Sequence, residues 1–330
     1  MKSMKTSPKT KAKSESTKVS AAAGLSGPDL SVEIAGYRFK NPIWTASGTC
    51  GYGEELDEIF DLNTLGGIVT KSITWKPRQG HPPSRVSEES SGMLNAIGLA
   101  NVGVKAYVDE KLPFLEKYGL GVIVNVAGFD FQEYIDVCAR LADHPRADMV
   151  ELNISCPNIS SGGIEFGADP KQVEKIVRAV KRVFPRPVIP KLSPNVTDIA
   201  EIARGAEAGG ADAISLINTF IAMGVDIHSK RPTLSNNRGG LSGPAIKPIA
   251  LSMVNSVYEA VSVPVIGIGG AANYEDVVEF MICGASAVQL GTALFREPDL
   301  PVRVLSDLTK FLIQGSYNSV TDLIGSIKMN

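Results

Sequence analysis

The sequence has few cysteines, and their scarcity excludes a common kind of metal site. Its four cysteines stand at positions 50, 138, 156 and 283, widely spaced, and no CxxC pair occurs among them. A zinc or iron–sulfur site held by cysteines of this chain is therefore not expected, and we predict no metal. Sparse unpaired thiols fit a reducing, cytoplasmic compartment.

A charge excess and a long apolar run are lacking too. The formal net charge is −2 over 330 residues, so no strong basic field indicates nucleic acid as a partner. No stretch approaches the ~18 unbroken apolar residues of a membrane-spanning helix. An apolar share of 44% with 21% charged residues is typical of a soluble globular protein.

Residues 1–27 differ in composition from the rest of the chain. They are rich in Lys, Ser, Thr and Ala and show no apolar periodicity, which predicts a disordered tail. The tail lacks the apolar core of a secretory signal, and a transit peptide is disfavoured because it carries Lys rather than Arg. We expect residues 28–330 to form a single domain that begins with a small β-hairpin over 29–40.

A repeated pattern follows the hairpin, in which a short apolar run ends in polar residues or glycine and an amphipathic helical segment comes next. Eight such units occur. Apolar strands that alternate with helices predict a parallel sheet covered on both faces. Eight repeats over roughly 250–300 residues predict a closed (β/α)8 barrel, the TIM barrel. A doubly wound open sheet is the alternative, but it usually has about five or six strands.

The predicted strands cover residues 42–48, 67–74, 121–128, 149–155, 187–193, 213–219, 264–270 and 287–294. The predicted helices cover residues 54–60, 104–118, 131–142, 171–184, 198–208, 245–260, 274–283 and 300–314. Two connections are unusually long, over 75–101 and 220–243. Both leave the carboxyl ends of strands, which form the catalytic face of such a barrel, so we expect them to supply a substrate lid.

The segment 149–163, MVELNISCPNISSGG, has the pattern of a strand that passes into a functional loop. Pro157 cannot donate to a strand ladder, so the strand should end near it and leave Cys156 at the strand end. Asn153 lies inside the predicted strand and needs a hydrogen-bond partner if both faces are covered. Taken alone, the segment is equally compatible with a small buried thiol and a turn-capping asparagine.

Polar residues occur at the same level on six of the predicted strands. Burying such groups without partners would cost at least ~1–3 kcal/mol each, so a polar ligand is the economical explanation. One isolated lysine or asparagine in a strand could be explained by a hydrogen bond or ion pair with a residue of a neighbouring helix. The residues are Ser47, Lys71, Asn125, Asn153, Lys191, Asn218 and Thr219.

Glycine, in contrast, ends the seventh and eighth predicted strands. The motif GIGG contains Gly269 and Gly270, and Gly291 with Thr292 closes the eighth strand. Glycine lets backbone N–H groups approach an anion, and the loops after strands seven and eight hold phosphate in such barrels. A lone GxGG could be a tight turn, but this position favours a phosphate.

A phosphate at one end and lysines at the other fit flavin mononucleotide (FMN). Lys71, Asn125 and Lys191 would meet the end of the ligand that lies away from the phosphate. A positive group beside the N1–C2 carbonyl edge of the flavin would stabilise its reduced state. Which of the two lysines has this role is open.

The chain resembles the class 1 dihydroorotate dehydrogenases, flavoenzymes of pyrimidine synthesis, over residues 29–313. The similarity rests on the motifs ASGTCGYGEE, TKSIT, MLNAIGLAN, ELNISCPN, RGGLSGPAIKP, GIGG and LGT. The tract SSGGIEFG is more similar to the NAD-linked (1B) subclass than to the fumarate-linked (1A) one. The membrane-bound, quinone-using class is disfavoured because it typically has Ser at the position of Cys156 and an apolar amino-terminal helix.

The resemblance implies that FMN-dependent oxidation of (S)-dihydroorotate to orotate, in de novo UMP biosynthesis, is the activity, with Cys156 as the base. It implies that FMN contacts Ser47, Lys71, Ser72, Asn125, Asn153, Lys191, Ile217, Gly243, Gly269, Gly270, Gly291 and Thr292. It implies that dihydroorotate contacts Lys71, Asn95, Ala96, Ile97, Gly98, Leu99, Asn153, Asn218 and Thr219.

The resemblance also implies two routes for the electrons. If NAD+ is the acceptor, a second subunit with FAD and a 2Fe–2S cluster is implied, around a homodimer core in a heterotetramer. If fumarate is the acceptor, it would use the same flavin face and need no partner.

Three other functions are compatible with parts of the pattern. A dihydropyrimidine dehydrogenase-like flavoenzyme would reduce uracil, but a carboxylate held by Lys71 and Asn95 favours dihydroorotate. A lyase could use Lys191 as a Schiff base. A non-catalytic phosphate- or flavin-binding protein would need Cys156 to be inert and would leave the long loops unexplained.

We expect Cys156→Ser to lower turnover by about 10²–10⁴-fold, because a serine hydroxyl is a much poorer base than a thiol at neutral pH. FMN should stay bound. Steady-state rates together with the flavin absorbance of the purified variant check this. Near-wild-type turnover would remove Cys156 from the mechanism.

Overall fold

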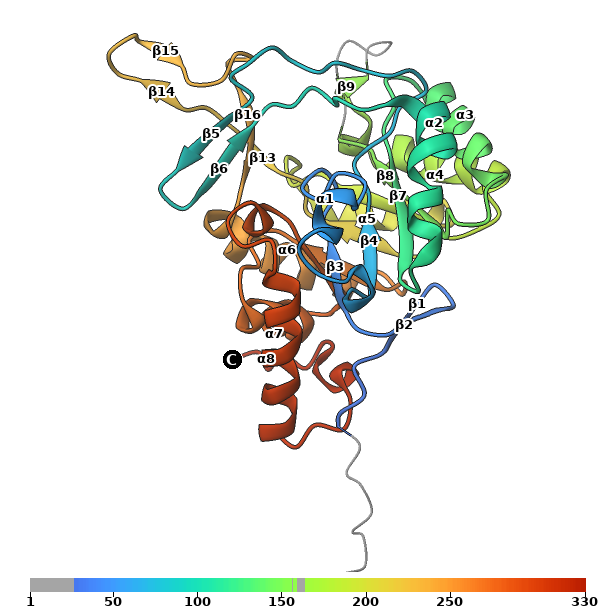
Figure 1. Ribbon diagram of the computed structural model, residues 1–330, viewed down its shortest axis with the longest axis vertical. Coiled ribbons are helices and arrows are strands. Elements are labelled where there is room, and N and C mark those ends of the chain that lie inside the picture. Colours follow the sequence, from blue (N-terminus) through green and yellow to red (C-terminus); the bar gives the residue numbers. More distant parts are fainter. Residues whose placement is uncertain (1–26, 156, 159–163) are drawn as a thin grey trace, which may run out of the picture.

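The computed structural model describes residues 27–155, 157–158 and 164–330. The predicted tail over 1–27 therefore lies outside the described residues, apart from its last position. Eight parallel strands close a barrel that helices surround (Figure 1). This confirms the (β/α)8 barrel and excludes the open sheet. In their hydrogen-bonded order the strands are β3 (Ile43–Thr45), β4 (Gly67–Val69), β7 (Gly121–Val126), β8 (Met149–Asn153), β11 (Val188–Leu192), β12 (Ile214–Leu216), β17 (Val265–Ile268) and β18 (Ala285–Leu290).

Side-chain caps and apolar stripes explain where the helices form. Asp130, Asp198 and Asn273 each accept a hydrogen bond from a backbone N–H of the first turn of the helix that follows. The buried residues of each long helix recur at three- and four-residue spacing and face the barrel. The helices are α1 (Glu54–Asp57), α2 (Gly103–Ala106), α3 (Phe131–Ala142), α4 (Pro170–Val183), α5 (Ile199–Ala208), α6 (Lys247–Ala260), α7 (Tyr274–Ile282) and α8 (Leu300–Gln314).

The helix predicted over 104–118 differs from the structure. Here α2 passes into a π-helical turn over Tyr107–Lys111 and then a 3-10 segment over Pro113–Lys117. Pro113 has no N–H and its ring clashes with the preceding turn of an α-helix, so a regular helix cannot run through this position.

The amino-terminal hairpin closes the end of the barrel opposite the predicted site. It consists of β1 (Val32–Ile34) and β2 (Tyr37–Phe39), joined by a turn in which Ala35 and Gly36 both have positive φ. Phe39 is buried and its ring lies 4.5 Å from that of Trp44 in β3. A Cβ on Gly121, the first residue of β7, would come within 2.2 Å of the Phe39 ring. Phe39 therefore fills the amino-terminal mouth between β3 and β7.

The two long connections pair with each other over the opposite end of the barrel. They form a four-stranded antiparallel sheet in the order β13-β16-β6-β5, made of β13 (Phe220–Ala222), β16 (Gly239–Ser242), β6 (Gly92–Asn95) and β5 (Val86–Glu89). A further hairpin, β14 (Val225–Asp226) with β15 (Arg231–Pro232), extends outward beyond this sheet (Figure 1). The sequence predicted a lid but not a sheet, because Asn95 and its partner Gly240 are 145 positions apart.

A short antiparallel pair, β9 (Pro157–Asn158) with β10 (Ile164–Glu165), follows β8. Within the described ranges, no helix is both long and apolar enough to cross a membrane.

We expect Phe39→Ala to lower the free energy of unfolding by about 3–5 kcal/mol, because it empties the space between β3 and β7. Tyr37→Ala on the same strand is the matched control and should cost much less, since Tyr37 is 37% exposed. Urea unfolding followed by fluorescence measures both. Equal losses would show that Phe39 is not a barrel plug.

Candidate active site

A cleft lies at the carboxyl ends of the barrel strands, beneath the four-stranded sheet. Its cavity has a volume of about 230 Å³ and opens to solvent. Residues after six barrel strands line it together with β6 and β16. Its lining includes Ser47, Gly48, Thr49, Lys71, Met93, Asn95, Ile97, Lys191, Ile217, Asn218, Thr219, Ser242, Gly243, Gly269, Gly270, Gly291 and Thr292.

One end of the cleft is built from glycine backbone and hydroxyl groups. Gly270 follows β17 with a φ of 85°. A Cβ at this position would come within 2.8 Å of the Gly243 carbonyl oxygen and 2.9 Å of Lys247 Cβ. Only glycine allows the two loops to approach so closely. On the other side, Thr292 Oγ1 donates to Ser242 Oγ at 2.7 Å. Such an end suits a phosphate bound by backbone N–H and hydroxyl groups.

The remaining wall of the cleft carries two lysines. Lys191, on β11, is 7% exposed. Lys71, just after β4, is half-buried, and burial lowers its pKa. The nearby Arg85 guanidinium lowers the pKa of Lys71 further, whereas Glu55 opposes the shift. The cleft wall therefore presents two lysine side chains, which suit an anionic ligand.

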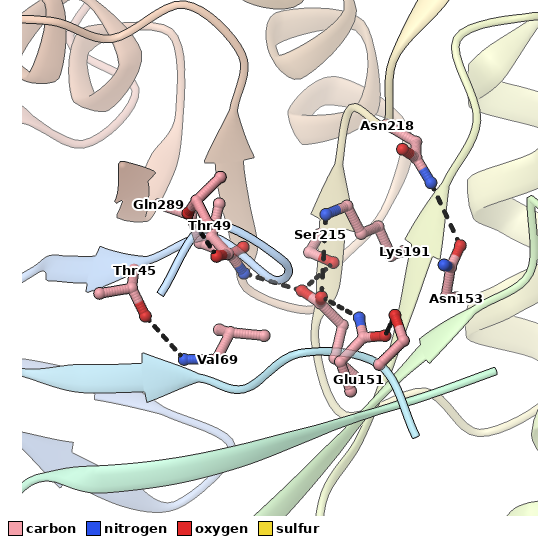
Figure 2. A network of polar contacts seen from close by, with 12 residues as sticks. Thr45, Thr49, Val69, Glu151, Asn153, Lys191, Ser215, Asn218 and Gln289 are labelled. Carbon is pink, nitrogen blue, oxygen red and sulfur yellow. Dashed lines mark hydrogen bonds and ion pairs between the residues drawn. The ribbon is translucent and has the colours of Figure 1, made fainter. Parts of the chain in front are cut away.

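Hydrogen bonds hold Asn218, which lines the cleft, and Asn153, the last residue of β8. Asn218 Nδ2 donates to Asn153 Oδ1 at 3.1 Å (Figure 2). The backbone carbonyl of Asn153 accepts from the Tyr134 hydroxyl at 2.5 Å. The Asn218 Oδ1 in turn accepts from the backbone N–H of Thr219 at 2.8 Å. These bonds fix the orientation of both amides at the mouth of β8 and β12.

A buried carboxylate lies beneath this wall, and sequence reasoning missed it. Glu151 of β8 is fully buried and accepts from Asn125 Nδ2 at 2.7 Å, Ser215 Oγ at 2.8 Å and Gln289 Nε2 at 2.7 Å (Figure 2). The Lys191 ammonium lies 3.9 Å from its Oε1. The sequence did contain an indication of it, because Glu151 stands inside the apolar strand MVELN. A glutamate is rarely buried without a partner.

The structure brings most of the predicted site residues together. Three residues predicted to touch FMN are not among those that line the cleft: Ser72, Asn125 and Asn153. Asn125 accepts from Ser72 at 2.5 Å and is fully buried. Ala96, Gly98 and Leu99 lie beside Asn95 and Ile97 but do not line the cleft. Cys156 lies outside the described residues, and the ligand contacts of all these residues stay predictions.

The other cysteines are poorly suited to act as a base. Burial raises the pKa of Cys50 to about 11. Burial also raises the pKa of Cys138 and of Cys283. None of these three thiols lines the cleft. Among the cysteines that the structure describes, none would supply a thiolate at neutral pH.

A closed (β/α)8 barrel whose cleft has a glycine-rich end and two lysines in its wall fits the class of FMN-dependent oxidoreductases. The family model "Dihydroorotate dehydrogenase" matches residues 29–312. The chain belongs to the dihydroorotate dehydrogenase family, whose enzymes are FMN-dependent oxidoreductases of pyrimidine biosynthesis.

Three curated relatives illustrate the similarity. The chain is 50% identical over 302 residues to the "Dihydroorotate dehydrogenase B (NAD(+)), catalytic subunit" of Geobacter sulfurreducens, covering 92% of this chain and 99% of the relative. It is 48% identical over 299 residues to the protein of the same name from Alkaliphilus oremlandii, covering 91% and 99%. It is 48% identical over 301 residues to a "Putative dihydroorotate dehydrogenase A (fumarate)" of Solibacter usitatus, again covering 91% and 99%. The similarity supports the 1B subclass.

We expect Lys71→Met to stabilise the FMN-free protein at neutral pH, because it removes a partly buried charge that faces Arg85. The folded state lowers the pKa of Lys71, so the unfolded chain binds more protons between that pKa and ~10.5. The stability of the wild type should therefore rise with pH across this window, and the advantage of the variant should shrink. Thermal unfolding at neutral and alkaline pH measures this difference. A constant difference would exclude a depressed pKa at Lys71.

Proposed function

We propose that the cleft oxidises (S)-dihydroorotate to orotate with FMN bound along its floor. The observation that carries the proposal is the meeting, in one cleft, of the glycine end after β17 and β18 with Lys71, Lys191 and two asparagines. The glycine end suits the phosphate of FMN, and the lysines and asparagines suit the polar edges of its aromatic ring system. The family membership of the chain supports the same activity.

The residues present fit the cofactor. Gly269, Gly270, Gly291 and Thr292 would hold its phosphate through N–H and hydroxyl groups. Lys191 would face its pyrimidine edge, with Asn125 oriented behind. When bound, FMN supplies the hydride acceptor for C6 of the substrate.

The substrate would lie between the cofactor and the four-stranded sheet. Asn95 and Asn218 offer amides, which both donate and accept and so match the amide edges of a dihydropyrimidine. Lys71 would pair with the carboxylate of the substrate. Since Asn95 belongs to β6 of the sheet and its Nδ2 donates to Gly240 O at 3.3 Å, the sheet itself positions one side of the substrate.

Cys156 would take the proton from C5 as the C5–H bond breaks, while C6 loses its hydride and a C5=C6 double bond forms. An unperturbed thiol has a pKa of about 8.5, so only a few per cent is thiolate at neutral pH.

The names of the B-type relatives support NAD+ as the final acceptor, and "catalytic subunit" implies a partner. We propose that the partner carries FAD and a 2Fe–2S cluster and that two copies of this chain form the core of a heterotetramer. The fumarate name of the Solibacter usitatus relative, at a similar identity, favours a second candidate in which fumarate is reduced without a partner.

The decisive experiment is anaerobic addition of dihydroorotate to the purified yellow protein. Bleaching of the flavin absorbance is expected, whereas dihydrouracil should leave it unchanged because it lacks the carboxylate. Reoxidation is then compared with fumarate and with NAD+, each with the chain alone. Rapid reoxidation by fumarate would show that fumarate is the electron acceptor and that no partner subunit is needed. If the flavin does not bleach, the proposed activity is wrong.

We expect the rate of the bleaching step to rise with pH between about 7 and 9, because the thiolate fraction of an ordinary thiol, with a pKa of ~8.5, increases over this range. Stopped-flow absorbance at saturating dihydroorotate measures the step directly. A rate that does not change with pH over this range would count against a thiolate base.

A further inference from the structure

The buried Glu151 has no role in the chemistry described so far. It lies on β8, with a fully buried side chain, and points into the interior of the barrel beneath the cleft (Figure 2). A carboxylate in such a place is costly unless it is paired and fully hydrogen-bonded. Its surroundings therefore bear on what it does.

Both oxygens of Glu151 face donors from four other barrel strands or their ends. Oε1 accepts from Asn125 Nδ2 and faces Lys191 Nζ, and Oε2 accepts from Ser215 Oγ and Gln289 Nε2. The orientation of the Asn125 amide is set independently, because its Oδ1 accepts from Ser72 Oγ. A set of donors on both oxygens is what an ionised carboxylate requires.

The link to the cleft runs through Lys191. Its side chain is 8% exposed, its ammonium lies 3.9 Å from Glu151, and Lys191 is one of the residues that line the cleft. The carboxylate itself does not reach the cleft lining. It can therefore act on a ligand only through the charge and position of its neighbours.

The geometry points to Glu151 as a positioning residue that, through its ion pair with Lys191, fixes the ammonium and sets the reduction potential of the FMN bound in the cleft. The inference rests on the proposed function, which places FMN against Lys191. Electron uptake adds negative charge to the cofactor. A lysine whose charge is balanced by Glu151 favours this uptake less than a lysine without a counter-charge.

Four proteins test the pair as a charge cycle: wild type, Glu151→Gln, Lys191→Met and the double variant. We measure the midpoint potential of bound FMN by spectroelectrochemistry. Glu151→Gln leaves an unbalanced positive charge and should shift the potential to more positive values than wild type. Lys191→Met leaves an unbalanced negative charge and should shift it to more negative values. The double variant, again balanced, should return close to wild type.

Ser215→Ala is the matched control, because it removes one hydrogen bond to the same carboxylate without changing any charge. Its potential should stay at the wild-type value even if its melting temperature falls. If Glu151 had only a structural role, the variants would be less stable than wild type. Their midpoint potentials would not rise in Glu151→Gln and fall in Lys191→Met. Equal potentials in wild type and Glu151→Gln would overturn the inference.

If Glu151→Gln does not retain FMN, the stability of the FMN-free proteins decides. A buried ammonium without its carboxylate is costly, so the double variant should melt at a higher temperature than Glu151→Gln. A double variant that is no more stable than Glu151→Gln would overturn the pairing. Bleaching of the wild-type flavin by dihydroorotate tests the proposed function. The potentials of the variants test the inference, so the two can fail separately.

Discussion

The hydrogen-bonded closure between β18 and β3 is the constraint on which the site depends. The last strand pairs in parallel with the first, in the register Val288↔Ile43 to Leu290↔Thr45. Because all eight strands run the same way around a closed ring, their carboxyl ends meet at one rim. Residues as far apart in the chain as Ser47 and Thr292 thereby line one cleft. An open sheet would separate these two strand ends to opposite edges.

Closure also creates an interior in which polar groups must satisfy one another. The hydrogen-bonded set around Glu151 uses residues of β7, β8, β12 and β18, so no pair of adjacent strands contains it. Two members of the set lie across the ladder from residues that line the cleft, because Ser215 pairs with Lys191 and Gln289 pairs with Ile268. The polar interior therefore connects the barrel to the wall of the cleft at these two positions.

The roof of the site arises from a different kind of pairing. Strands β6 and β16 come from two connections that leave different barrel strands, and their ladder places Asn95 opposite Gly240. A side chain at Gly240 would clash with Thr219, which itself lines the cleft. The four-stranded sheet thus packs directly against the carboxyl end of the barrel, with Gly240 at the contact with Thr219.

The sequence by itself determined the order of strands and helices, the barrel and the two long connections, because periodicity, glycine and proline act locally. It did not predict the broken helix after α2, the four-stranded roof or the buried Glu151 with its partners. The helix depends on one proline within an otherwise helical pattern. The roof and the partners of Glu151 depend on contacts between residues distant in the chain, whose energies exist only once the barrel has closed.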